Sequence, residues 1–266
     1  MFQAFGALFR RQMSHGRRAI RDALAWLYSL RCVSGGRLMA DFDRKLSQLV
    51  SDLITQGDRV VDMVLRAVES YFEVDTAKAG DVISDDLVID RVDVEIERAS
   101  IPLLAMGQTD EYKIRSVLMI VKVNNELERI ADSAVNMAEV VLDGLSADFR
   151  PPDRFRVMAN SVIGMLRDAN RALAGLDVGL AERVLSFDDA VDQFKREIFL
   201  NAEQAVAAKE FDVKFAFRLR TVTAALERIA DHCTNICEQI IYLQSGCVVR
   251  HSPEGWTKPH EPKLAG

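Results

Sequence analysis

Two pairs of acidic residues with the same spacing lie in two nearly identical stretches of the 266-residue chain. The segment LERIADSAVNMAE contains Glu128 and Asp132, and the segment LERIADHCTNICE, 99 residues later, contains Glu227 and Asp231. Residues four apart share one face of an α-helix, so each copy predicts two adjacent carboxylates. Carboxylate oxygens are the preferred ligands of hard metal ions. The pairs are candidates for a cation site, and the alternative is a solvated helix face repeated by duplication.

Two further acidic pairs precede these segments, one in each half of the chain. Consecutive antiparallel helices are normally neighbours, so two pairs should face each other in each half. Like charges at this spacing destabilise a helix by about 0.2–0.5 kcal/mol per pair, and a bound cation would remove that repulsion. We therefore predict that the four pairs ligate metal: Asp86 with Asp90, Glu128 with Asp132, Asp188 with Asp192, and Glu227 with Asp231.

Steps of 100° per residue divide each LERIAD helix into an apolar stripe and a polar stripe. We expect the polar stripe to lie on the flank that faces away from the core, and Asp93 and Glu97 continue the acidic line of the preceding helix. The predicted core stripe of the first copy is Leu127, Ile130, Ala131, Ala134, Met137, Ala138 and Val141. The predicted polar stripes are Asn124, Glu128, Asp132, Asn136 and Glu139, and Thr223, Glu227, Asp231, Asn235 and Glu238.

The elements that must position these residues are six long amphipathic helices, because apolar residues recur at threes and fours. The second of them carries Val82, Val88, Ile89, Val92 and Ile96 as its apolar residues. The paired prolines of SADFRPPD (146–153) mark a linker between two halves of the same plan. The predicted helices are 41–73, 76–105, 110–145, 153–176, 178–208 and 212–245.

The predicted fold class is all-α, with two tandem, pseudo-repeated antiparallel three-helix bundles. The first bundle should span residues 39–146 and the second 147–252, followed by an irregular tail at 253–266. A repeat of this length is too long for a solenoid unit, which favours domain duplication.

The first 38 residues differ from the rest of the chain in charge. They contain seven Arg and one acid, Asp22, which gives a charge of +6. Since the whole chain has a net charge of -6, residues 39–266 carry a charge of -12. The segment could be a basic helix at a membrane surface, giving peripheral membrane association, or an upstream extension from a misplaced start with Met39 opening the folded domain. The acidic main body argues against nucleic acid as a partner. No apolar run approaches the ~18 residues of a transmembrane helix.

Cysteine and histidine residues show no pattern typical of a catalytic site. Cys233 and Cys237 are expected to be buried, and the absence of a disulfide framework suits a reducing compartment. No Glu lies three residues before any of the four His, as a di-iron oxidase would require. His232, which follows Asp231, is expected to be solvated or to cap a helix. The chain has no Gly-rich phosphate loop and no catalytic triad spacing.

The four acidic pairs resemble the signature motifs of the PhoU family, which consists of regulators of phosphate transport in bacteria and archaea. The stretch NELERIAD and the stretch ERIADHCTNICEQIIYLQSGCVVRH are similar to the family's two signatures, and the resemblance covers about residues 39–252. Family members commonly have Gly where Ala131 and Ala230 stand, and Ala is compatible with a helix and should change little. The basic segment 1–38 lies outside the family pattern.

The resemblance implies that the eight motif residues bind iron, zinc, manganese or magnesium, often as multinuclear clusters on the surface. It also implies a cytoplasmic, non-enzymatic negative regulator of phosphate uptake and of the phosphate-starvation response. Its expected partners are the ATPase subunit of a phosphate ABC transporter, a sensor histidine kinase and a second copy in a homodimer. Two alternatives remain: a helical adaptor whose acidic surface docks basic protein patches without metal, and a carboxylate-bridged metalloenzyme.

Overall fold

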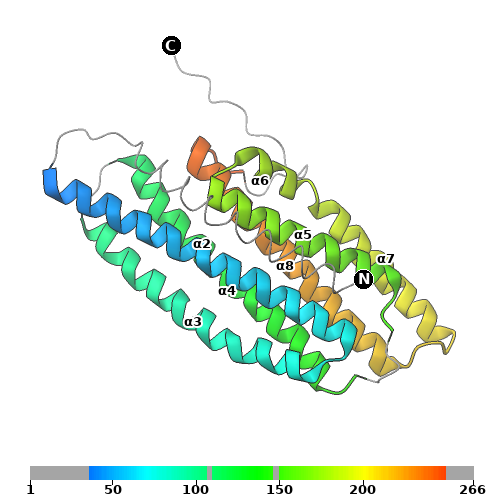
Figure 1. Ribbon diagram of the computed structural model, residues 1–266. Coiled ribbons are helices and arrows are strands. Elements are labelled where there is room, and N and C mark those ends of the chain that lie inside the picture. Colours follow the sequence, from blue (N-terminus) through cyan, green and yellow to red (C-terminus); the bar gives the residue numbers. More distant parts are fainter. Residues whose placement is uncertain (1–35, 107–109, 146–149, 250–266) are drawn as a thin grey trace, which may run out of the picture.

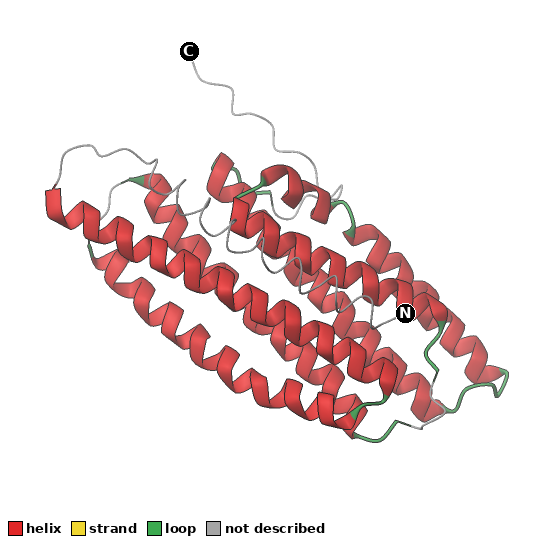
Figure 2. Cartoon of the chain, in the orientation of Figure 1, coloured by secondary structure: helices red, strands yellow, loops and turns green. Residues whose placement is uncertain are grey.

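The computed structural model describes residues 36–106, 110–145 and 150–249, which form long helices joined by short loops (Figures 1 and 2). These residues contain no strand, and the prediction of an all-α helical bundle is confirmed. The basic segment up to residue 35, the linker residues 146–149 and the tail from residue 250 lie outside the described residues. The helices of the first half are α2 (Gly36–Glu73), α3 (Thr76–Ala105) and α4 (Glu111–Leu142).

The start of α2 differs from the prediction. The helix begins at Gly36, five residues before the predicted position 41, so the glycine-containing stretch does not interrupt the helix after this point. Glycine in a helix interior costs about 1 kcal/mol relative to alanine, because the helix restricts its flexible backbone. At the first residue of a helix this cost is small. The other predicted helix ends agree with the structure within three residues, except in the middle of the second half.

Aspartate residues begin four of the helices. The side chains of Asp75, Asp110, Asp177 and Asp212 accept hydrogen bonds from backbone N–H groups three residues later, at 2.7–3.0 Å. Each bond satisfies an N–H group that has no partner within the helix, and the negative charge suits the positive end of the helix dipole. These caps explain why α3, α4, α6 and α8 begin where they do.

Residues 150–249, the described part of the second half, form four helices instead of the three that were predicted. The prediction of one helix over residues 178–208 is wrong, because Ser186 and Phe187 interrupt it and separate a short helix from a long one. The Ser186 hydroxyl donates to the carbonyl oxygen of Arg183, which ends the first helix, and two acids, Asp188 and Asp189, favour a new helix start. The helices are α5 (Asp153–Gly175), α6 (Val178–Leu185), α7 (Asp188–Ala207) and α8 (Val213–Ser245).

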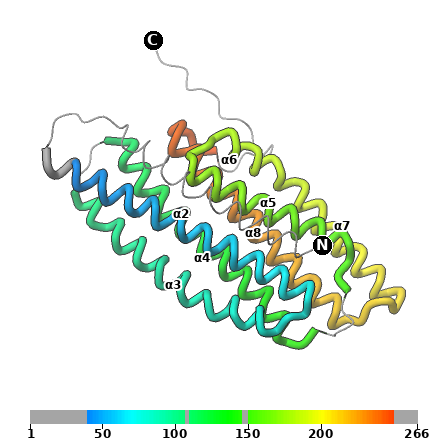
Figure 3. Tube along the Cα trace, viewed as in Figure 1, coloured from blue at the N-terminus to red at the C-terminus, as the bar shows by residue number. Residues whose placement is uncertain are grey.

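The two repeated helices, α4 and α8, pack on each other in the middle of the molecule (Figure 1). They run antiparallel: Arg218, near the start of α8, donates to the carbonyl oxygens of Asp143 (2.5 Å) and Gly144 (2.6 Å), just beyond the end of α4. The outer helices α3 and α7 pack on α4 and α8 respectively, and α2 packs on α5. The tube in Figure 3 follows α4 and α8 behind α2 and α5.

One hydrophobic core runs through both halves. The predicted core stripe of α4 is confirmed, since all seven of its residues are buried. The prediction that Val88 belongs to the apolar face of α3 is wrong, because its side chain is 42% exposed. Among the described helices, none combines the length and the apolar character that crossing a membrane requires.

Candidate metal centre

The acidic pairs of α3 and α4 lie close together on the surface of the first half. We call Asp86, Asp90, Glu128 and Asp132 the first cluster. Partial burial, with the charges of Asp90 and Asp132, raises the pKa of Asp86 to about 6. Because Asp132 belongs to α4, its effect on Asp86 of α3 shows that the two pairs face each other across the helix pair. Glu128 also has a raised pKa, through partial burial and then the charges of Asp132 and Asp93.

The prediction that the polar stripe of α4 faces away from the core is wrong for part of its length. Asn124 is buried between α3 and α4, with 2% of its surface exposed. Its Nδ2 donates to the Asp93 carboxylate at 2.6 Å and to the Asp93 backbone carbonyl at 3.0 Å. The flank of α4 that holds Asn124 therefore packs against α3, whereas Asp132, Asn136 and Glu139 are exposed.

The acidic pairs of α7 and α8 are brought together in the same way. We call Asp188, Asp192, Glu227 and Asp231 the second cluster. Partial burial, and after it the negative charges of Glu227 and Asp188, raise the pKa of Asp231 to about 6. Asp188 also has a raised pKa, first through partial burial and then through Asp192 and Asp189. Asp188 is the first residue of α7, whereas its counterpart Asp86 lies in the middle of α3.

Two cationic side chains that were not among the predicted site residues contact the second cluster. The Nζ atom of Lys195 lies 2.7 Å from Oε1 of Glu227, and Nη1 of Arg196 lies 3.7 Å from Oδ2 of Asp192. Lys195 follows Asp192 by three residues, which places it on the same flank of α7 and could have identified it. Thr223, which was predicted to lie in the polar stripe of α8, is instead fully buried. Its hydroxyl can be buried without a large cost because it donates to the Leu219 carbonyl oxygen at 2.7 Å.

A polar contact lies between the two clusters, at the junction of α4 and α8. Nδ1 of His232 lies 2.6 Å from Oε2 of Glu126, and Nδ2 of Asn235 donates to the same oxygen at 3.0 Å. Burial alone would raise the pKa of Glu126, but the hydrogen bonds from His232 and Asn235 outweigh it and hold that pKa below its usual value. The expectation that His232 is solvated or caps a helix is wrong. Its ring pairs with a carboxylate across the two halves.

Both clusters lie on one face of the molecule. Helix α4 packs against α2 and α8 packs against α5, and the exposed residues Asp132 and Asp231 lie on flanks that these contacts leave free. Because Glu126 lies opposite His232 in an antiparallel helix pair, Glu128 and Asp231 lie at nearly the same height along the molecule. The face formed by α3, α4, α8 and α7 thus carries both clusters, with the His232–Glu126 contact between them.

The donor set of each cluster fits a hard cation. Each cluster combines four carboxylates from two helices. Partial burial, and after it the charges of neighbouring carboxylates, raise the pKa values of Asp86 and Asp231, and a cation would relieve that repulsion. Within the described ranges, no three Asp, Glu, His or Cys side chains are placed so that they could hold one metal ion. Binding of one ion by three or more of these carboxylates would therefore require their side chains to rotate. The metal ligands therefore stay a prediction.

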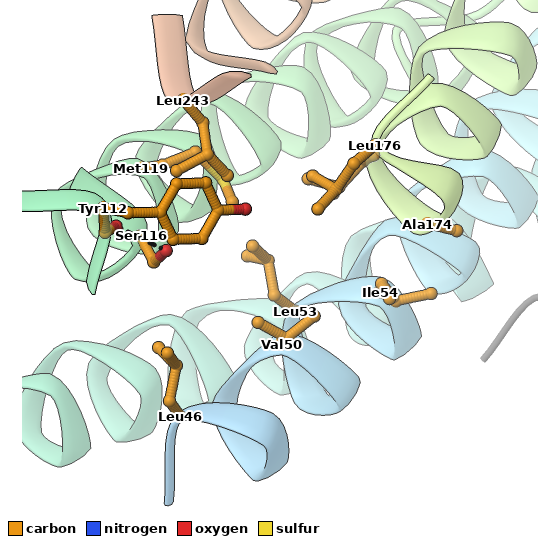
Figure 4. A pocket seen from close by; sticks show the side chains of 11 residues that line it. Leu46, Val50, Leu53, Ile54, Tyr112, Ser116, Met119, Ala174, Leu176 and Leu243 are labelled. Carbon is orange, nitrogen blue, oxygen red and sulfur yellow. Dashed lines mark hydrogen bonds between the residues drawn. The ribbon is translucent and has the colours of Figure 1, made fainter. Parts of the chain in front are cut away.

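A small apolar pocket lies elsewhere, where α2, α4, α5 and α8 meet (Figure 4). Its wall consists almost entirely of aliphatic side chains, among them Leu53, Met119 and Leu243, with Tyr112 and Ser116 at one side. None of the cluster residues lines it. An apolar pocket without a charged group offers no ligand to a metal ion, so the candidate site is the acidic face and not this pocket.

The two buried cysteines of α8 are not candidate ligands for either cluster. Cys233 and Cys237 are buried, as predicted, and burial raises the pKa of both thiols. A buried thiol with a raised pKa stays protonated and is a poor metal ligand.

Comparison with known proteins identifies the fold and the family. The family model described as the PhoU domain matches residues 53–141 and 155–240, one copy in each half. The chain is 32% identical over 216 residues to the phosphate-specific transport system accessory protein PhoU homolog of Pseudomonas putida, covering 79% of this chain and 83% of that protein. It is 29% identical over 207 residues to PhoU homolog 1 of Thermotoga maritima, covering 77% of this chain and 89% of that protein.

Solved structures give the same result. The crystal structure of PhoU from Pseudomonas aeruginosa superposes with a TM-score of 0.73 at 27% identity, covering 77% of this chain and all of that chain. The phosphate transport system regulatory protein PhoU from Streptococcus pneumoniae shares the fold with a TM-score of 0.74 at 24% identity, covering 79% of this chain and all of that chain. With two matched domains and relatives aligned over most of their length, the chain belongs to the PhoU family.

Proposed function

We propose that this protein is a metal-binding, non-enzymatic negative regulator of phosphate uptake and of phosphate-starvation signalling. The observation that carries the proposal is the presence of one acidic cluster in each PhoU domain, on a shared face. Relatives such as the Escherichia coli protein, 27% identical over 215 residues, are named phosphate-specific transport system accessory protein PhoU.

The eight cluster carboxylates would hold the metal ions: Asp86, Asp90, Glu128 and Asp132 in the first cluster, and Asp188, Asp192, Glu227 and Asp231 in the second. Hard or borderline ions such as iron, zinc, manganese or magnesium suit an oxygen-rich donor set. A bound ion would supply positive charge, which neutralises the cluster and changes what the face can bind. The carboxylates themselves would fix the ion between two helices of one bundle.

We propose that the regulator acts in the cytoplasm, as a homodimer, on two partners. These are the ATPase subunit of a phosphate ABC transporter and a sensor histidine kinase. A face that carries two acidic clusters suits a protein partner with basic side chains, and its local charge would depend on metal loading. No step of this role requires the protein to transform a substrate.

Metal analysis of the protein purified without chelators tests the metal part of the proposal, and anomalous scattering from crystals would locate the ions. We expect ions between α3 and α4 and between α7 and α8. Protein that binds no ion under these conditions would contradict metal binding and favour the adaptor, which docks basic patches through the acidic face alone. Turnover of phosphate esters by metal-loaded protein would contradict the non-enzymatic role.

A genetic experiment tests the regulatory part. Deletion of the gene should raise phosphate uptake and the starvation response in phosphate-replete cells, and the wild-type gene should restore both. Affinity purification of the tagged protein should recover the transporter ATPase and the sensor kinase. Unchanged uptake in the deletion strain would contradict a negative regulator, whatever the metal content of the protein.

A further inference from the structure

The two acidic clusters differ at one position that faces the partner helix. When Asp90 is aligned with Asp192, the residue three positions later is Asp93 in the first half and Lys195 in the second. Both side chains reach toward the LERIAD helix of their own half, since Asp93 bonds to Asn124 of α4 and Lys195 bonds to Glu227 of α8. At this position the first half therefore has a negatively charged residue, Asp93, and the second half has a positively charged residue, Lys195.

The Lys195 ammonium group occupies the second cluster. Its Nζ atom lies 2.7 Å from Oε1 of Glu227, and both side chains are largely shielded from solvent. An ammonium group at this distance gives the carboxylate a positive charge of the kind that a metal ion would otherwise provide. A divalent ion that used Glu227 would have to displace Lys195 or share the carboxylate with it.

The first cluster extends further along the helices than the second. Asp93 and Glu97 follow Asp90 on the same flank of α3, so the first cluster with this extension contains six acids. The second cluster contains four acids, with the ammonium group of Lys195 and the guanidinium group of Arg196. Asn124 is buried and holds the Asp93 carboxylate at 2.6 Å, whereas its own Oδ1 accepts no hydrogen bond from the described part of the chain. A buried amide oxygen without a donor is costly unless a donor or a cation meets it.

The position of Asn124 suits a ligand to a cation. Amide oxygens bind hard cations, and a half-turn of the Asn124 amide would exchange Nδ2 for Oδ1 at the Asp93 carboxylate. In the second half the aligned residue is Thr223, whose hydroxyl donates to the Leu219 carbonyl oxygen. The first half thus has a buried amide at the place where the second half has a satisfied hydroxyl.

We propose that the two clusters bind divalent ions unequally: Asp93 and Asn124 add a subsite to the first cluster, and Lys195 takes the place of an ion in the second. This inference rests on the proposed metal binding and concerns residues outside the eight predicted ligands. The first half should hold more ions, or hold them more tightly, than the second.

Titration of chelator-stripped full-length protein with Mn²⁺ tests this inference, with bound ion counted by equilibrium dialysis and elemental analysis. Glu128→Gln with Asp132→Asn removes half of the carboxylates of the first cluster and so weakens its binding relative to the second, and Glu227→Gln with Asp231→Asn does the reverse. In the former background Lys195→Met should raise Mn²⁺ affinity on the order of tenfold, because a competing charge is removed. In the latter background Asp93→Asn should lower it by a similar factor.

Matched controls separate local from general charge effects. Lys214→Met removes the same charge at an exposed position near the start of α8, and Glu95→Gln removes an acid from the opposite flank of α3. Neither should change Mn²⁺ affinity more than about twofold, because exposed charges at a distance are screened. Lys195→Gln is a second variant in case Lys195→Met does not fold.

The outcomes distinguish the two proposals. Failure of the wild-type protein to bind Mn²⁺ or any other ion would overturn the proposed metal binding and this inference with it. Binding by the wild-type protein, combined with unchanged affinity in both Lys195 variants and in Asp93→Asn, would overturn the inference alone. Equal effects of Lys195→Met and Lys214→Met would also overturn it, because the change would then reflect net charge.

Discussion

Nδ1 of His232 lies 2.6 Å from Oε2 of Glu126, and this contact joins the two halves of the molecule at their central helices. The partners are 106 residues apart in the sequence, and each keeps less than a fifth of its side-chain surface exposed. The contact has no counterpart on the other side of the α4–α8 junction, where the aligned residues are Ser133 and Ala225. The duplication therefore produced similar bundles but an asymmetric junction.

Removal of the Glu126 charge should weaken this junction. Glu126→Gln is expected to lower the free energy of unfolding by about 1–2 kcal/mol, because a partly buried, charge-assisted hydrogen bond is lost. Urea titration followed by circular dichroism measures this change. Glu139→Gln, an exposed acid on the same helix, should change the free energy by less than about 0.5 kcal/mol. Equal losses in the two variants would contradict a specific contact.

The contribution of Glu126 should also depend on pH. Its pKa is lower in the folded protein than in an unfolded chain, so the folded state favours the charged form. The stability gained in this way is present above the ordinary pKa of a glutamate and is lost as the pH falls through the lowered folded pKa. The difference between wild type and Glu126→Gln should therefore shrink toward acidic pH. A difference that stays constant down to pH 3 would exclude this linkage.

A close approach of α2 to α5 should be sensitive to one methyl group. A Cβ atom at Gly57 would lie 2.0 Å from Oδ1 of Asn170, whose Nδ2 donates to Asp58 at 2.8 Å. Gly57→Ala should lower the free energy of unfolding by about 1–3 kcal/mol, because the Asn170 amide must turn away and give up its bond to Asp58, or the two helices must separate. Thermal and urea unfolding would measure the loss.

Two further variants test the cause. Addition of Asn170→Ala to Gly57→Ala removes the obstructing amide and should recover part of the loss. Gly164→Ala, on α5 with no atom within 4 Å of the added Cβ, should stabilise the protein by up to about 1 kcal/mol. A similar loss in Gly57→Ala and Gly164→Ala would show that the helix contact is not the cause.

Neutralisation of the α4 pair should separate metal binding from folding. Glu128→Gln with Asp132→Asn should lower the metal content of the first bundle, because two of its four carboxylates are replaced. Helicity should not fall, since neither side chain belongs to the core and like-charge repulsion is relieved. Elemental analysis and circular dichroism of the same sample measure both quantities. Loss of the fold would contradict the placement of these residues on the surface.

The helices and the core were predictable because they depend on local spacing. Apolar residues at threes and fours indicated the core stripe of α4, and the paired prolines marked the linker between the two halves. The capping aspartates were not used in the prediction, although they lie at the observed helix starts. The break at Ser186 was missed because apolar residues continue on both sides of it, with Leu185 and Val191 both buried. Apolar periodicity therefore does not reveal a two-residue interruption between a short helix and a long one.

The acidic pairs were predictable for the same reason, since residues four apart must share a helix face. Contacts between helices were not. The pairing of Lys195 with Glu227 and of His232 with Glu126 depends on how each helix is rotated about its axis and on the register of α4 against α8. Asn124 was expected at the surface because the count of 100° steps does not reveal how closely α3 approaches that flank.

The shared height of the two clusters on one face has a consequence for recognition. A partner with two basic segments at a matching separation would bind the face as a bivalent ligand, and its second contact would form at a high effective concentration. The avidity of such a complex would depend on the rigidity of the α4–α8 junction, because a fixed separation favours simultaneous engagement. The bond between Glu126 and His232 would then set the spacing of a two-point docking platform.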